Sequence, residues 1–185
     1  CAVCLVQGSS AYWAHVGDSR LYLYRQGGLI GQTKDHSKVQ YLVDQGIIGA
    51  HEVADHPDRN KIFSCLGGLV DPVIDLSKRT PLRSGDVIVM CTDGLWEALS
   101  ADELYGFLKY STLDEGIEEM LLAAEHRMKQ RADNLSAICL RWQDNVTSAL
   151  PVQSRPMLET NHKTLVEDAR IRNAEKKLRG TKEVQ

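Results

Sequence analysis

Three short segments of the chain each place an aspartate where a strand-like run meets a turn. They are HVGDSR with Asp18, CTDG with Asp93 and RADN with Asp133. Carboxylate oxygens are the ligands that Mg²⁺ and Mn²⁺ prefer, with water completing the coordination shell. Two such ions can hold a phosphoryl group and activate a water to hydrolyse it. Aspartate also forms ordinary turns, because its side chain binds nearby backbone amides, so the spacing alone leaves both interpretations open.

The elements before these turns have the patterns of strands. Two pairs of apolar segments around glycine-containing turns predict an antiparallel meander of four strands: CAVCLV with AYWAHV, and LYLYR with LIGQT. The apolar segment VIVMC predicts a buried strand that ends just before Asp93. A charged group at the end of a buried strand is costly unless it is solvated, paired or bound to a metal.

Other segments predict helices, further strands and an exposed loop. The segment DHSKVQYLVDQG has a helical period, with Gly46 as C-cap and His36 as a candidate cap, and GAHEVADHPDRN from Gly49 to Asn60 is a polar excursion. Capping boxes at Ser100 with Glu103 and at Thr112 with Glu115 predict two helices. The second helix has an apolar stripe of Ile117, Leu121, Ala124 and Met128. Further strands are predicted at KIFSCLGG, VIDL and LSAICLRW.

This order of strands, then helices, then a closing strand predicts an α+β fold with a mostly antiparallel sheet. We expect residues 1–142 to form the domain and residues 143–185 to be a charged tail or linker, partly helical or disordered, because aromatic residues are absent from it.

Composition excludes several functions. A net charge of −3 and a pI of about 6.1 give no basic surface for nucleic acid or an anionic membrane. No apolar run approaches the roughly 18 residues of a membrane span. The 5 cysteines are scattered, which favours buried thiols in a reducing compartment over a disulfide framework. We therefore expect a cytoplasmic protein.

The ordered segments HVGDSRLYLYR, QTKDHSKVQYLVDQG, KIFSCLGG, DVIVMCTDGLWEALS and RADNLSAICL resemble the metal-dependent protein phosphatases of type 2C, especially the compact bacterial members. The resemblance covers about residues 1–142. It implies an antiparallel β-sandwich flanked by helices, in α-β-β-α layers, with the metals at one end of the sandwich. The family also has a D-G-x-G-G block upstream, with an aspartate that bridges the metals and a histidine that acts as the general acid. We find no such block here and expect the chain to be the C-terminal two-thirds of the domain.

The resemblance assigns roles to individual residues. Asp93 and Asp133 match ligands of the first metal and are the expected catalytic carboxylates. Asp18 matches the ligand of a weaker third metal, where Glu97 can assist. The residues that match supporting positions of the motifs are Ser19, Arg20, Gly94 and Asn134. The excursion matches the flap beside the active site, where the candidates for substrate contact are His51, His56, Arg59 and Asn60.

The implied activity is hydrolysis of phosphoserine and phosphothreonine in proteins by a metal-activated water, with two Mn²⁺ or Mg²⁺ ions and a weaker third. The expected partners are phosphorylated proteins and a cognate serine/threonine kinase pathway, and we expect a monomer. The present chain alone is expected to be a poor phosphatase, since the bridging aspartate is not in it. The alternative is a pseudophosphatase or a regulatory binding module with the same fold.

Overall fold

The computed structural model describes residues 1–109, 112–128 and 134–144, all within the unit Cys1–Asn145. Asp133 and most of the predicted tail at 143–185 lie outside these described residues. The described strands are β1 Ala2–Gln7, β2 Ser10–His15, β3 Arg20–Arg25, β4 Gly28–Gln32, β5 Asp75–Leu76, β6 Thr80–Pro81, β7 Val87–Cys91 and β8 Ala137–Arg141. The described helices are α1 Lys38–Asp44, the 3₁₀ turn η1 Ala50–Glu52, α2 Asp93–Ala98, α3 Ala101–Leu108 and α4 Leu113–Met128.

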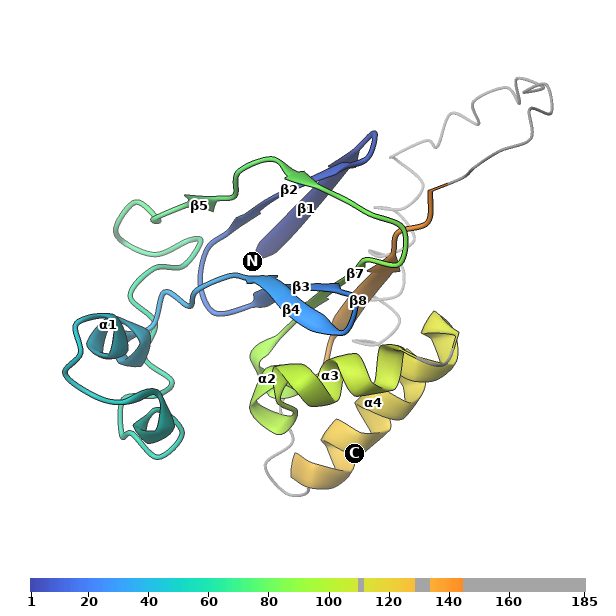
Figure 1. Cartoon of the computed structure of the whole chain (residues 1–185). Coiled ribbons are helices and arrows are strands. Elements are labelled where there is room, and N and C mark those ends of the chain that lie inside the picture. Colours follow the sequence, from blue (N-terminus) through green and yellow to red (C-terminus); the bar gives the residue numbers. More distant parts are fainter. Residues whose placement is uncertain (110–111, 129–133, 145–185) are drawn as a thin grey trace, which may run out of the picture. The chain divides into compact units, whose positions relative to one another are not determined.

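The strands form two antiparallel sheets (Figure 1). The first sheet has the order β1-β2-β5, with β6 also paired to β2, and the second has the order β4-β3-β7-β8. Both predicted hairpins are confirmed. The single four-strand meander is wrong, because β2 pairs with β1, β5 and β6 while β3 pairs with β4 and β7. The chain changes sheets at the corner after β2, where Gly17 has a φ of +99°, a conformation that favours glycine.

The two central strands of the second sheet, β3 and β7, are buried on both faces. Alternate residues of β3 divide between two apolar clusters, since successive side chains of a strand point to opposite faces. Leu21 and Leu23 pack with Ala11 of β2 between the sheets, whereas Tyr22 and Tyr24 pack with the helices. Two of the strands that adjoin the aspartate turns, β3 and β7, are therefore buried between apolar clusters on both faces.

Helices α2, α3 and α4 cover the outer face of the second sheet (Figure 1). The capping box of α3 is confirmed, with the Ser100 backbone amide donating to Glu103 and the Ser100 hydroxyl facing the Glu103 amide. Thr112 and Glu115 make the same reciprocal pair at the start of α4. The predicted apolar stripe of α4 packs in the cluster that contains Tyr22 and Tyr24 of β3. The described layers are thus helices, sheet and sheet, in agreement with the predicted α+β sandwich.

Three local predictions are wrong. The segment KIFSCLGG forms bends and turns, and among the described residues its one strand-like pairing is a single bridge from Ser37 to Ile62. His36 does not cap α1, since the Ser37 side chain accepts the capping hydrogen bond from the Gln40 amide. The turn after VIVMC is the first turn of a short helix, α2, with Thr92 at the N-cap position but without a capping hydrogen bond from its side chain.

Within the described part of the chain, no helix is long and apolar enough to span a membrane.

Candidate metal centre

Strand register brings the Asp18 turn, the Asp93 turn and the chain just before β8 to one end of the second sheet. Arg20, the first residue of β3, pairs with Cys91, the last residue of β7. Cys91 also pairs with Ala137, the first residue of β8. The residues just before β3, just after β7 and just before β8 therefore lie at the same sheet end. The first two of these segments carry the GDSR and TDG motifs, and the described chain before β8 starts at Asn134, the last residue of the RADN motif.

Asp18 and Asp93 interact electrostatically at this end. Asp18 lies half-buried in the corner between β2 and β3, and burial raises the pKa of its carboxyl. The negative charge of Asp93 raises the pKa of Asp18 further. A carboxylate whose ionisation is disfavoured by burial and by a neighbouring carboxylate is a suitable ligand for a hard cation, because the ion offsets the negative charge.

Asp93 is fixed by the junction of β7 with α2. It is the first residue of α2, and its Oδ1 accepts a hydrogen bond from the Gly94 amide at 2.9 Å. Thr92 connects this junction to the chain before β8, since its hydroxyl donates to the Asn134 carbonyl at 2.9 Å. The Thr92 amide also donates to the carbonyl of Ser136 at 3.1 Å. The β7–α2 junction and the chain before β8 are therefore held to each other by backbone and hydroxyl hydrogen bonds.

Arg20 connects the Asp18 corner to α2. Its guanidinium donates two hydrogen bonds of 2.8 Å to the carboxylate of Asp35, whose side chain is 7% exposed. The same guanidinium lies 3.5 Å from the centre of the Trp96 ring, a cation–π arrangement. Trp96 Nε1 in turn donates to the Asp18 carbonyl at 2.9 Å. Although burial alone lowers the pKa of Arg20, the hydrogen bonds to Asp35 raise it above its ordinary value, so the cation is permanent.

The remaining predicted residues lie either near the Asp93 end of the second sheet or in the segment 49–60. Gly94 is buried in α2, Glu97 is exposed one turn further along the helix, and Ser19 lines a cavity of about 150 Å³ with Thr92 and Ser136. The flap candidates lie elsewhere: His56, Arg59 and Asn60 line an open cavity of about 490 Å³, formed entirely by residues 54–61. His51 lies in η1, exposed and outside the lining of that cavity. Neither cavity is lined by Asp18 or Asp93.

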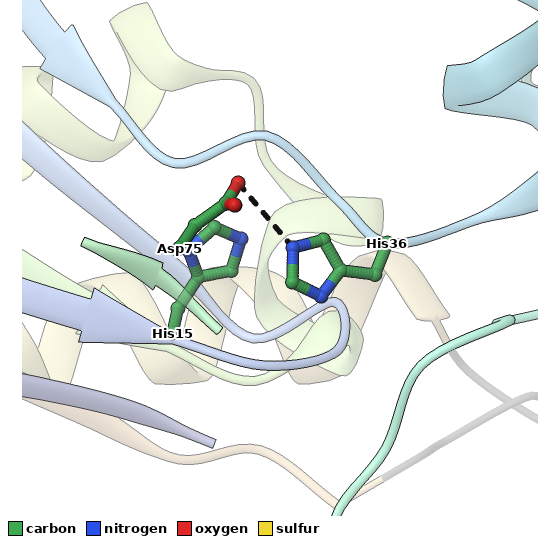
Figure 2. Close-up of side chains that lie close together, drawn as sticks. All are labelled: His15, His36 and Asp75. Atoms are coloured by element: carbon green, nitrogen blue, oxygen red, sulfur yellow. Dashed lines mark ion pairs between the residues drawn. The ribbon is translucent and has the colours of Figure 1, made fainter. Parts of the chain in front are cut away.

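A histidine cluster was not predicted from the sequence. His15 at the end of β2, His36 before α1 and Asp75 in β5 each offer a ligand atom, and these atoms lie within 4.8 Å of one another (Figure 2). His15 and Asp75 are cross-strand neighbours, and the two imidazole rings have centroids 4.6 Å apart. No local motif signals this group, because its members come from three segments that are far apart in the sequence: β2 and β5 pair in a sheet, and His36 is joined to the corner after β2 by a hydrogen bond from its amide to the Gly17 carbonyl.

Hydrogen bonds define where the protons of this cluster lie. His15 Nε2 is 2.7 Å from the Lys34 carbonyl, which can only accept, so this nitrogen carries a proton. His36 Nδ1 accepts from the Gly17 amide at 3.3 Å, so a neutral ring has its proton on Nε2, which lies 3.4 Å from Asp75 Oδ2. A metal needs a lone pair on the nitrogen that binds it. The cluster therefore has metal-like spacing, but its hydrogen bonds favour protons at these positions.

Comparisons with known proteins agree with the motif assignment. No protein-family model matches the chain. A protein phosphatase of the 2C type from Streptococcus pyogenes is 42% identical over 127 residues, which is 68% of this chain and 51% of that protein. The chain is homologous to the bacterial type 2C phosphatases. It spans about half the length of this relative.

Solved structures of type 2C phosphatases have the same fold. The serine/threonine phosphatase of S. agalactiae superimposes with a TM-score of 0.67 at 33% identity, over 75% of this chain and 57% of that one. The catalytic domain of the phosphatase PstP in complex with two manganese ions superimposes with a TM-score of 0.60 at 30% identity. That match covers 74% of this chain and 55% of the PstP chain. The type 2C homology thus accounts for the sandwich and for the order of its motifs.

Proposed function

We propose that this protein is a metal-dependent protein serine/threonine phosphatase. The observation that carries the proposal is the register of β3, β7 and β8, which supports a common position for the three aspartate motifs at one sheet end. Homology to type 2C phosphatases, one of them solved with two manganese ions, supports the same assignment. In this proposal residues 1–142 are the phosphatase part and residues 143–185 are an appendage.

The proposed ligands of the main metal site are Asp93 and Asp133, with Asp18 and Glu97 at a weaker third ion. Their carboxylates fit Mn²⁺ or Mg²⁺, which prefer hard oxygen donors and retain several waters. A bound ion of this kind neutralises phosphate charge and activates water for attack. The chain's own contribution is rigidity: β7 fixes Asp93, while Trp96 and Arg20 hold the backbone of the Asp18 corner. Fixed charges aimed at the reacting phosphate need little reorganisation during the reaction.

The substrates in this proposal are phosphoserine and phosphothreonine side chains of proteins, with a serine/threonine kinase as the opposing enzyme. The flap residues His56, Arg59 and Asn60 face a common cavity, which supports a role for this segment in contacting the substrate. We further propose that the protein acts as a monomer in the cytoplasm.

The proposal is tested by phosphate release from a phosphothreonine peptide, measured with and without Mn²⁺ at high protein concentration. We expect Asp93→Asn to lower the Mn²⁺-dependent rate by at least about tenfold, because one carboxylate of the main site is lost. The matched control is Asp102→Asn, which changes an exposed carboxylate in the first turn of α3. Equal rates in the two variants would refute the role of Asp93. Complete absence of Mn²⁺-dependent release would match the expectation that this chain alone is a poor phosphatase, and the role of Asp93 is then tested by the Mn²⁺ requirement of the same two variants.

A further inference from the structure

Gly17 is held by hydrogen bonds on both sides of its backbone, and both bonds come from one residue. The His36 amide donates to the Gly17 carbonyl at 2.9 Å, and the Gly17 amide donates to His36 Nδ1 at 3.3 Å. Gly17 is buried and directly precedes Asp18. Its φ of +99° is a conformation that few L residues adopt, so this corner requires glycine.

His36 is itself held firmly. It is 4% exposed, and its ring lies against the ring of His15, with centroids 4.6 Å apart, and that of Phe63, 5.8 Å apart. The Phe63 amide donates to the His36 carbonyl at 2.9 Å. Asp75 faces the opposite nitrogen, Nε2, which makes no hydrogen bond among the described residues (Figure 2). The carboxylate therefore favours a proton on Nε2 and leaves Nδ1 free to accept from Gly17.

We propose that His36 is a positioning residue for Asp18, and that Asp75 maintains the tautomer this role requires. The inference rests on the proposed function in one respect: it treats Asp18 as a metal ligand. His36 does not touch the metal site. It acts through the Gly17 backbone, and the conformation of that backbone determines where the Cα and the side chain of Asp18 lie. A metal on the histidine cluster is the competing explanation for the unpartnered Nε2, but it would require a proton on Nδ1, where the Gly17 amide already points.

Two substitutions of His36 distinguish the roles of its two ring nitrogens. Asparagine carries a side-chain oxygen near the position of Nδ1 and can still accept from Gly17. Glutamine reaches toward the position of Nε2 and lacks an acceptor near Gly17. We call the hydrogen bond from the Gly17 amide to the side chain at position 36 the Gly17 clamp. His36→Asn should therefore preserve the clamp, and His36→Gln should break it, although both variants remove the imidazole ring.

The experiment measures amide hydrogen exchange at Gly17 by NMR in the 185-residue chain. We expect exchange at Gly17 to be about tenfold faster in His36→Gln than in wild type, the effect of one ordinary hydrogen bond. His36→Asn should stay within about threefold of wild type. The Mn²⁺ concentration that broadens the Asp18 amide by half should rise several-fold in His36→Gln only. Equal exchange in both variants, or faster exchange in His36→Asn alone, would overturn the proposal.

Two controls keep the outcome interpretable. If His36→Gln does not fold, the tautomer is read in the wild-type protein from the ¹⁵N shifts of the His36 ring, at about pH 8, above the ordinary histidine pKa of about 6.5. A proton on Nε2 supports the clamp, and a proton on Nδ1 overturns it. If Mn²⁺ does not broaden Asp18 even in wild type, the metal role of Asp18 fails, whereas the exchange rate of Gly17 still decides the clamp.

Discussion

Replacing Trp96 with phenylalanine removes one hydrogen bond and leaves an aromatic ring in nearly the same place. The lost bond is the one from Trp96 Nε1 to the Asp18 carbonyl, 2.9 Å long and partly buried. An ordinary hydrogen bond contributes about 1 kcal/mol to the free energy of unfolding. The guanidinium of Arg20, 3.5 Å from the centre of the Trp96 ring, also interacts less strongly with phenylalanine, by about 0.5 kcal/mol. The expected total is about 1.5 kcal/mol.

Thermal unfolding followed by circular dichroism measures this effect. For a domain of this size, about 1.5 kcal/mol corresponds to a fall in Tm of roughly 3–6 °C. The matched control is Trp142→Phe, which makes the same change where Nε1 donates to an exposed carboxylate, Asp144, at 2.8 Å. We expect a smaller fall there, because water replaces an exposed partner. Equal falls in the two variants would refute the view that Trp96 holds the Asp18 corner.

Two further predictions concern the helices that cover the second sheet. Ser100→Ala removes the hydroxyl that accepts from the Glu103 amide and donates to the Glu103 carboxylate, and it keeps the contact made by the Ser100 backbone amide. The free energy of unfolding should therefore fall by about 1 kcal/mol in urea titrations, and an unchanged midpoint would contradict the capping role. Hydrogen bonds from Arg127 lower the pKa of Glu103 to about 2 from its ordinary 4.5. Because the folded-state pKa is the lower one, the stabilisation is fully present above about pH 4.5 and is lost as the pH falls toward 2. Glu103→Gln should therefore be less stable than wild type at pH 7, and the difference should shrink at pH 3; a constant difference would exclude this ion pair as the cause.

The sequence predicted those elements whose pattern is local. The hairpins, the β7 strand and the capped helices α3 and α4 follow from alternation, helical period and capping residues that lie within a few positions of each other. Two errors came from pairing choices. The LYLYR segment was placed beside β2, because nothing in a strand's own residues states which neighbour it will have. KIFSCLGG was apolar enough for a strand but makes only one isolated bridge within the described residues.

The candidate site was predictable in part. Motif resemblance picked out Asp18 and Asp93, and the structure brings their turns to one end of the second sheet. The residues that hold those turns were not all found: Trp96 and His36 act through backbone atoms of Asp18 and Gly17, and such contacts leave no spacing pattern in a sequence. Asp133 lies outside the described residues, and its role stays a prediction.

The most direct test of the metal assignment is a Mn²⁺ titration of the ¹⁵N-labelled chain. Mn²⁺ is paramagnetic and broadens the amide signals of nearby residues even when binding is weak. We predict that the amides of Asp18 and Gly94 broaden first, and that Asp93→Asn requires at least about tenfold more Mn²⁺ for the same effect. Broadening that begins instead at His15, His36 and Asp75, or a titration unchanged by Asp93→Asn, would contradict it.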